Sequence, residues 1–212
     1  MSFNKIEEKV RKNPRDTTIV VAGKNRTIKE IEEVIKAGAT IIGENKAQEL
    51  LEKYYLLKDK VSFHFIGHLQ TNKVKYIINK VNLIHSVDSL RLAKEISKQA
   101  KKPIHILVEV NTTREKNKFG ILEENLVDFI IKTSKFNNLQ IQGLMTMGVF
   151  TKNPENNRKY FRKLKKLAEF IEHKNIPCVE MKHLSMGTSQ DFEVAIEEGA
   201  TIVRIGRSIF EH

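Results

Sequence analysis

The sequence predicts an α/β protein: a single (β/α)8 TIM barrel with an extra helix before the first strand. Short apolar runs rich in Val and Ile alternate with helical patterns from end to end, and eight such alternations are typical of this barrel. The 212 residues lie near the lower limit of about 200 for the fold. No linker divides them, so residues 1–212 are expected to form one domain. The competing fold, an open doubly wound sheet, lacks its G-x-G-x-x-G signature, and no P-loop is present.

The expected strands are short continuous apolar runs, the pattern of parallel strands buried on both faces. They cover residues 17–22, 40–42, 61–66, 82–85, 104–110, 139–144, 179–184 and 201–205. Helical patterns follow every strand except the last, at residues 27–37, 44–58, 69–79, 89–101, 122–135, 154–174 and 190–198, and one more precedes the first strand at residues 3–12.

Residues typical of helix ends stand at several of these boundaries. Thr27 begins a capping box, and Asn153 is placed to cap a helix that starts with Pro154. Gly38 and Gly199 stand where helices are expected to stop in a left-handed cap. Local chemistry and hydrophobic pattern therefore agree on where the elements begin and end.

The chain is strongly basic, with 37 Lys and Arg against 26 Asp and Glu, for a formal net charge of +11. Such a charge suits nucleic acid, a membrane surface or anionic metabolites. Many of the cations, as in residues 159–171, recur at the spacing of a helix's outer side, so a solvated helix face is the favoured interpretation. Without a nucleic-acid motif, an aromatic-rich basic patch or any Trp, nucleic acid ranks last among the candidate partners.

The expected compartment is the cytoplasm. Cys178 is the only cysteine, which excludes a disulfide framework and a multi-cysteine zinc site; at the start of a strand it is expected to be a small core residue. No apolar run approaches the roughly 20 residues of a membrane helix, and the N-terminus is charged at once, unlike a secretory signal. His64 and His68 lack a carboxylate or thiol at metal-ligand spacing, so no metal site is predicted.

Active sites of barrels lie at the carboxyl ends of the strands, and two cations stand there. Lys24 directly follows the first strand; it is either a loop lysine or an amine that desolvation activates to attack a carbonyl as a Schiff-base nucleophile. Arg204 lies within the last strand, where a buried guanidinium requires a partner. That partner is either an internal carboxylate or a ligand at the barrel mouth.

The segments after the seventh and eighth strands combine glycine with hydroxyl residues. Residues 185–191 hold Ser185, Gly187 and Ser189, and residues 206–208 hold Gly206 and Arg207. Ordinary turn chemistry and capping would explain such segments. Because barrels frequently bind phosphate with these same two loops, and because backbone N–H groups and hydroxyls together bind anions, a phosphate site is the favoured interpretation.

Three further candidates stand at strand ends. Asn45 follows the second strand and either donates a hydrogen bond to a ligand or caps the next helix. His64, in the third strand, is expected to be a hydrogen-bonded strand residue beside the ligand. Met145 closes the sixth strand and offers an apolar wall, with plain core packing the simpler account. A mouth lysine, a buried arginine and a two-loop phosphate site together suit a phosphorylated aldehyde.

Over nearly the whole chain the sequence resembles the pyridoxal phosphate (PLP) homeostasis proteins, single-domain relatives of the alanine racemase N-terminal barrel. The segments that carry the resemblance are residues 20–24, 42–45 with 48–49, 64–73, 110–112 with 118–121, 143–145 and 184–210, and the most specific of them are residues 184–191 and 203–206. The resemblance departs at Gly23, where the family usually has serine, at Thr188, where it usually has methionine, and at Arg207, where threonine is common. These departures leave PLP binding expected and bear on individual phosphate contacts.

The resemblance implies a role for each candidate. Lys24 corresponds to the lysine that holds PLP as an internal aldimine, and Arg204 to the arginine that faces the pyridine nitrogen. Asn45 and His64 correspond to residues lining the cofactor, and Met145 to its apolar floor. The phosphate is expected at Ser185, Gly187, Ser189, Gly206 and Arg207. No residue is assigned a catalytic role.

An arginine at the pyridine nitrogen disfavours its protonation, so the ring stabilises carbanions weakly. A second acid–base group, which in the racemase comes from another domain and subunit, is not expected in a chain of this length. The leading hypothesis is therefore a PLP-binding protein of intracellular vitamin B6 homeostasis with little or no turnover, expected to be a monomer, with PLP-dependent apo-enzymes as candidate partners. The alternative is a minimal PLP-dependent amino-acid racemase.

Overall fold

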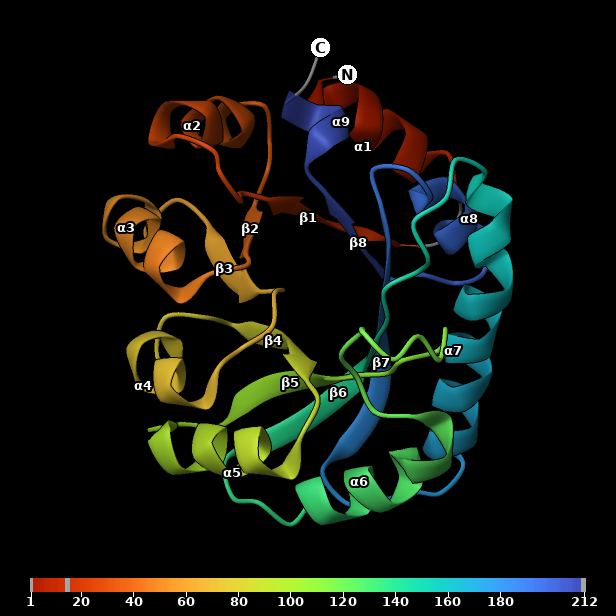
Figure 1. The fold of residues 1–212 in the computed structure, drawn as a ribbon. Coiled ribbons are helices and arrows are strands. Elements are labelled where there is room, and N and C mark those ends of the chain that lie inside the picture. The colour runs from red at the N-terminus through yellow and green to blue at the C-terminus, as the bar shows by residue number, and fades with distance from the viewer. Residues whose placement is uncertain (1, 14–15, 211–212) are drawn as a thin grey trace.

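A computed structural model describes residues 2–13 and 16–210 and confirms the predicted barrel (Figure 1). Eight strands close on one another in chain order, and every neighbouring pair is parallel. The strands are β1 (Thr18–Ala22), β2 (Ile41–Glu44), β3 (Ser62–Phe65), β4 (Leu83–Val87), β5 (Ile104–Glu109), β6 (Leu139–Met145), β7 (Val179–Thr188) and β8 (Ile202–Ile205). The barrel closes between β1 and β8, where Val20 pairs with Arg204.

Helices surround the barrel (Figure 1). The α-helices are α1 (Phe3–Arg11), α2 (Ile28–Lys36), α3 (Ala47–Leu57), α4 (Val74–Ile77), α5 (Leu90–Gln99), α6 (Leu126–Thr133), α7 (Arg158–Glu172), α8 (Phe192–Glu197) and α9 (Arg207–Phe210). Short 3-10 turns lead into three of them: η1 (Thr71–Lys73), η2 (Glu123–Asn125) and η3 (Pro154–Asn157). No helix of the described residues has both the length and the apolar character needed to cross a membrane.

The predicted helix boundaries are confirmed where capping chemistry indicated them. Thr27 caps α2 in a reciprocal capping box, an arrangement whose N-cap alone contributes about 1 kcal/mol. Asn153 accepts a hydrogen bond from the backbone of Glu155 at the start of η3. Gly38 and Gly199 have φ angles of +109° and +103°, the left-handed conformation expected where helices stop.

Three expectations are wrong. β7 continues through Thr188, because its last residues still pair with β8 across an irregularity between Ser185 and Thr188. The last strand is followed by a helix, α9. Cys178 is exposed and lies in a turn with φ +63° just before β7, so it is not a core residue.

The core consists of two clusters on opposite sides of the strands. Val20 belongs to the smaller cluster and Val21 to the larger one, because successive side chains of a strand point to opposite faces. The smaller cluster fills the barrel interior with Val20, Ile66, Leu83, Leu107, Met145 and Ile202. The larger one packs the outer face of the strands against the helices. The barrel interior beneath the mouth is therefore filled by side chains, and a ligand of the barrel has space only at the mouth.

Candidate functional site

A pocket of about 430 Å³ opens at the carboxyl ends of β1 and β8. Its wall combines residues at or after the carboxyl ends of six strands: β1, β2, β3, β6, β7 and β8. The lining residues are Ala22, Lys24, Asn25, Arg26, Asn45, Ile66, Met147, Thr188, Ser189, Arg204, Gly206 and Arg207. The volume falls in the range of small-molecule sites, about 300–1,000 Å³.

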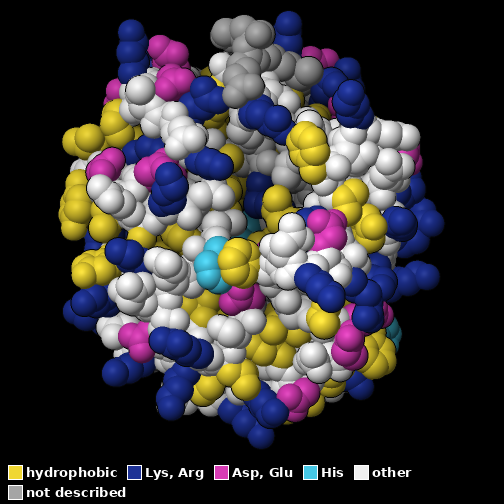
Figure 2. Space-filling model, in the orientation of Figure 1, with side chains coloured by type: hydrophobic (Ala, Val, Ile, Leu, Met, Phe, Trp, Pro, Cys, Tyr) yellow, Lys and Arg dark blue, Asp and Glu magenta, His cyan; other side chains and the backbone are white. Residues whose placement is uncertain are grey.

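The pocket is cationic. Lys24, Arg26, Arg204 and Arg207 line it, and none of the described lining residues is a carboxylate. The face of the molecule shown in Figure 2 carries Lys and Arg side chains around a central hollow. Four cations reaching one pocket from two segments, the loop after β1 and the end of β8, favour a compact, highly charged anion such as a phosphate monoester.

Lys24 is exposed in the loop that follows β1. Hydrogen bonds at the preceding residue, Gly23, fix the backbone of this loop. The N–H of Gly23 donates to the carbonyl of Gly43 at 2.9 Å, and Lys53 Nζ donates to the carbonyl of Gly23 at 2.6 Å. A Cβ at Gly23 would lie 2.3 Å from Glu44 Oε1. Glycine is thus the residue that this close approach requires, which gives a local reason for the departure from serine.

A buried ion pair lies directly beneath this loop. Lys53 Nζ donates to Glu44 Oε1 at 2.7 Å, and their side chains are 6% and 0% exposed. Burial raises the pKa of Glu44, whereas the ammonium of Lys53 lowers it. Glu44 Oε2 has no hydrogen-bond partner among the described residues. Removing one member of such a pair leaves an uncompensated buried charge, a cost of about 3–5 kcal/mol.

Arg204 forms the floor of the pocket on the β8 side. It is 5% exposed and donates to Ser185 Oγ at 2.5 Å, to the carbonyl of Thr146 at 2.9 Å and to Met147 Sδ at 3.0 Å. Burial lowers the pKa of Arg204 to about 10, although the negative charges of Glu109 and Asp191 raise it. The guanidinium therefore stays charged at neutral pH. No described carboxylate forms an ion pair with it, so the internal salt bridge considered for Arg204 is not formed.

A chain of buried hydrogen bonds runs from Arg204 into the barrel. Ser185 Oγ lies 2.8 Å from His85 Nδ1, and His85 Nε2 lies 3.0 Å from His64 Nδ1. Burial lowers the pKa of His64 to about 4, and it lowers that of His85 well below the usual range, with help from the neighbouring positive charges. Both imidazoles are therefore neutral at physiological pH, and the chain fixes the orientation of Ser185 and Arg204.

Glu109 is a buried carboxyl in the same barrel interior as His64 and His85. It stands at the end of β5, is 7% exposed, and no described group donates a hydrogen bond to its side chain. Burial raises the pKa of Glu109 to about 7; the negative charge of Asp88 raises it further, whereas Arg204 lowers it. The barrel interior below the pocket thus holds a carboxyl that changes charge near neutral pH.

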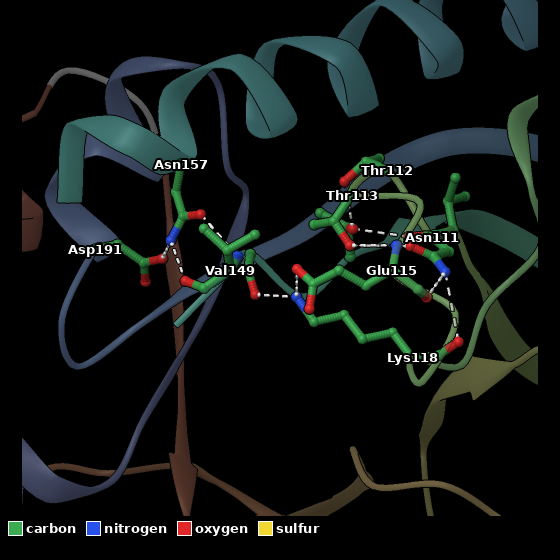
Figure 3. A network of polar contacts seen from close by, with 11 residues as sticks. Asn111, Thr112, Thr113, Glu115, Lys118, Val149, Asn157 and Asp191 are labelled. Atoms are coloured by element: carbon green, nitrogen blue, oxygen red, sulfur yellow. Dashed lines mark hydrogen bonds and ion pairs between the residues drawn. The ribbon is translucent and has the colours of Figure 1, made fainter. Parts of the chain in front are cut away.

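A polar network fixes the loop between β6 and η3 that forms the far side of the mouth (Figure 3). Asn157 Nδ2 donates to Asp191 Oδ2 at 2.7 Å and to the carbonyl of Val149 at 3.0 Å, and Asn157 Oδ1 accepts from the N–H of Val149 at 2.8 Å. From the other side, Lys118 Nζ donates to the carbonyl of Gly148 at 2.9 Å. The wall of the pocket is therefore held from two directions.

The structure places six of the ten predicted site residues in the pocket wall: Lys24, Asn45, Ser189, Arg204, Gly206 and Arg207. Asn45 does not cap a helix, because Lys46 is the N-cap of α3. Ser189 Oγ accepts hydrogen bonds from the backbone N–H groups of Gly206 and Ser208, at 3.3 and 3.2 Å. The two segments predicted to form a phosphate site are thus joined to each other.

The other four lie in strands outside the pocket lining: His64, Met145, Ser185 and Gly187. Met145 is buried in the interior cluster, and Met147 lines the pocket in its place. Gly187 has φ +87°, and a Cβ there would lie 2.5 Å from that of Ala195, so it permits α8 to pack on β7. These residues support the pocket from behind.

Several residues that support the pocket were not predicted from the sequence. His85 and Glu109 are polar residues within otherwise apolar strand runs, a signal that was available. Lys53 and Glu44 carried no such signal, since each reads as an ordinary residue of a helical pattern. No group of three or more His, Cys, Asp or Glu in the described chain is arranged to hold a metal ion.

Comparison with known proteins gives consistent matches. The sequence model of the alanine racemase N-terminal domain family matches residues 3–212. A pyridoxal phosphate homeostasis protein of Aquifex aeolicus is 49% identical over 184 residues, which cover 85% of this chain and 80% of the relative.

Solved structures agree with this. PipY of Synechococcus elongatus, solved without PLP, is 27% identical with a TM-score of 0.90, and solved with PLP bound it has a TM-score of 0.86; each alignment covers 98% of both chains. An alanine racemase of Clostridium difficile, 14% identical, has a TM-score of 0.76 over 99% of this chain and 56% of its own, which shows a shared fold.

Proposed function

The chain belongs to the alanine racemase N-terminal domain family, and on that premise we propose that it binds PLP in the pocket at β1 and β8 and serves in PLP homeostasis with little or no turnover. The relative from Aquifex aeolicus carries the name of that role, and PipY has been solved with PLP bound. The observation that carries the proposal is the pocket itself, in which one lysine and three arginines converge with no carboxylate among the described lining residues.

The residues present suit the chemical groups of PLP. Its phosphate is a compact dianion, for which Arg207 supplies charge and Ser189 supplies a hydroxyl donor, its Oγ being positioned by the N–H groups of Gly206 and Ser208. When bound, PLP supplies an aldehyde that condenses with a primary amine, and Lys24 is the only amine among the described lining residues. Arg204 is the buried cation proposed to face the pyridine nitrogen.

Arg204 argues for weak catalysis. Its pKa stays at about 10 in spite of burial, so it presents a positive charge and disfavours protonation of a nearby ring nitrogen. The hydrogen bonds to Ser185 and Thr146 hold the guanidinium in place. A ring kept unprotonated is a poor electron sink, and the chain is proposed to hold the cofactor without transforming amino acids efficiently.

A racemase is not supported by the pocket wall. Racemisation needs an acid–base group on each face of the substrate carbon. Besides Lys24, the described lining residues include no carboxyl, imidazole, thiol or phenol, and the two neutral histidines, His64 and His85, bond to each other beneath the pocket.

The test is an absorbance spectrum of the purified protein with added PLP, before and after borohydride, followed by peptide mass analysis. We expect a visible band that borohydride removes, leaving a pyridoxyl group on Lys24. A protein that takes up no PLP would overturn the proposed ligand. Steady racemisation of any member of an amino-acid panel by the loaded protein would overturn the non-catalytic role and leave PLP binding standing.

A further inference from the structure

A second cavity lies away from the barrel mouth, between α6 and α7. It measures about 550 Å³ and is lined by Glu123, Leu126, Val127, Lys159, Arg162, Lys163, Lys166, Leu167, Phe170 and Ile171. We refer to these ten residues as the α6–α7 groove. Nothing in the proposed PLP function uses it.

The floor of the α6–α7 groove is apolar. Leu126 and Ile171 are each 1% exposed and form its base, with Val127 and Leu167 half-buried beside them. Phe170, on the outer edge, is 52% exposed. The groove thus combines a continuous apolar strip with one exposed aromatic ring at its edge.

The rim is cationic and unevenly neutralised. Lys163 pairs with Glu123 at 2.8 Å, and Arg162 pairs with Glu198 at 2.8 Å. Lys159 and Lys166 are exposed and form no ion pair with any described carboxylate. Lys174, one turn beyond, lies over the ring of Phe170 at 4.4 Å. The groove therefore presents net positive charge around an apolar centre.

The dimensions suit an extended occupant. The lining residues of α7 run from Lys159 to Ile171, which at a rise of about 1.5 Å per residue is roughly 18 Å, or three helical turns. In Figure 2 Lys and Arg side chains follow the right-hand edge of the molecule, the edge that α7 forms in Figure 1. The cations thus form a stripe along one helix and do not converge on one point.

From these observations we infer that the α6–α7 groove binds an acidic amphipathic helix of a partner protein. Such a helix would place apolar side chains at i, i+3, i+4 and i+7 against Leu126, Leu167 and Phe170, the usual mode of helix-in-groove recognition. Its flanking Glu and Asp would face Lys159 and Lys166. Nucleic acid fits less well, because phosphates gain nothing from the apolar floor and the one aromatic ring among the lining residues, Phe170, has Lys174 over its face.

The test uses the full chain loaded with PLP and a fluorescein-labelled synthetic 16-residue peptide, helical by design, with Leu at i, i+3, i+4 and i+7 and Glu on both flanks. A scrambled peptide of identical composition is the control. We expect micromolar binding of the patterned peptide, at least tenfold tighter than the scrambled one, with backbone NMR shifts confined to α6 and α7.

Matched variants locate the contact. Lys159→Glu/Lys166→Glu should weaken binding at least tenfold, and Phe170→Ser should weaken it to a similar extent. The control, Lys29→Glu/Lys94→Glu, carries the same change of net charge on exposed residues of α2 and α5 and should bind as the unmodified chain does. Retained PLP absorbance in every variant shows that the barrel is folded and separates this test from that of the PLP site.

The inference is overturned if the patterned and scrambled peptides bind alike, if the groove variants bind as tightly as the control variant, or if the shifts map to another face. It is also overturned if the chain does not bind the peptide but binds oleate or a 20-nucleotide single strand, and if the groove variants abolish that binding.

Discussion

The pocket at β1 and β8 and the α6–α7 groove are both cationic, yet their charges are organised differently. The pocket gathers Lys24 and Arg26 from the loop after β1 and Arg204 and Arg207 from the end of β8 around a small volume. The α6–α7 groove takes its cations from one stripe of α7 over an apolar floor. Convergent charge suits a small, highly charged anion, whereas linear charge beside apolar surface suits an extended amphipathic partner. The arrangement of the cations, more than their number, distinguishes two kinds of ligand.

The two regions also differ in how deeply their charged groups are buried. Beneath the pocket the charges are buried, as in the pair of Lys53 with Glu44 and in Arg204 with its three acceptors. In the α6–α7 groove, Lys159 and Lys166 are exposed. Buried charges are fixed in position, and losing one is costly, while exposed charges contribute little to stability.

The largest effect is expected from Lys24→Ala, which should abolish the visible absorbance and the borohydride-stable label completely. Lys24 is the only amine among the described lining residues, so no other side chain of the wall replaces it. Lys166→Ala, in the α6–α7 groove, is the control and should leave the spectrum unchanged. Mass analysis after borohydride reports both. A full label elsewhere in Lys24→Ala would show that the pocket is not the anchoring site.

The second-largest effect is expected on stability, from changes in the buried pair of Lys53 and Glu44. Lys53→Met leaves the Glu44 carboxylate without its partner in an apolar setting and should lower the free energy of unfolding by about 3–5 kcal/mol. The surface counterpart Lys166→Met should stay within about 0.5 kcal/mol of the unmodified chain. The double variant Glu44→Leu/Lys53→Met should recover most of the loss, since no charge is then buried. Urea denaturation measures all three, and equal effects of the two lysines would contradict the contrast between the regions.

The third effect concerns pH. Glu109 has a pKa of about 7 in the native state against the ordinary value of 4.5, so the native state holds a proton that the unfolded chain releases, and stability falls as pH rises between these values. His64, with a native pKa of about 4 against 6.5, has the opposite sign: stability is lost as pH falls from 6.5 towards 4.

Glu109→Gln should remove the first slope and keep the second. At pH 8 the variant should gain stability relative to the unmodified chain, on the order of 3 kcal/mol at full ionisation. The measurement is the free energy of unfolding at several pH values from 4 to 8, with the exposed Glu124→Gln as the control. Identical pH profiles for Glu109→Gln and the unmodified chain would show that the carboxyl is not held in its neutral form.

The smallest effect is expected from Arg207→Gln. Arg207 is exposed, so the change removes one charge from the pocket without disturbing the core, and PLP affinity should fall about tenfold, or 1.4 kcal/mol. Lys159→Gln removes the same charge from the α6–α7 groove and should leave PLP affinity unchanged. Titration of the apo-protein with PLP at two salt concentrations compares them. If both variants lose affinity equally, the pocket's charges act only through the net charge of the molecule.

Much of the fold followed from local signals. The capping box at Thr27 and the positive φ of Gly38 and Gly199 were predictable because they depend on residues close in sequence. The end of β7 was not, because Ser185 to Thr188 read as a turn and stay in the strand through pairing with β8. Cys178 failed for a similar reason: its apolar neighbours suggested burial, but the turn before β7 exposes it.

The candidate site also has features that the sequence predicted and features that it did not. Residues at strand ends, such as Lys24 and Gly206, were found because the barrel places all strand ends at one mouth. Ser185 and His64 were also found, but in the structure they lie behind the pocket wall, where they support Arg204 through His85. A strand position alone does not tell whether a side chain faces the ligand or stands one layer below it.

By itself, the sequence determined the alternation of strands and helices, the helix boundaries, the family and the residues at the barrel mouth, because these depend on periodicity, capping and motif. Only the tertiary structure decided which cations converge, that Lys53 and Glu44 pair under Gly23, that two histidines are kept neutral in the interior, and that α6 and α7 leave an apolar groove open. Burial and long-range contact set these features, since the free energy of a charge depends on which distant segments exclude water from it.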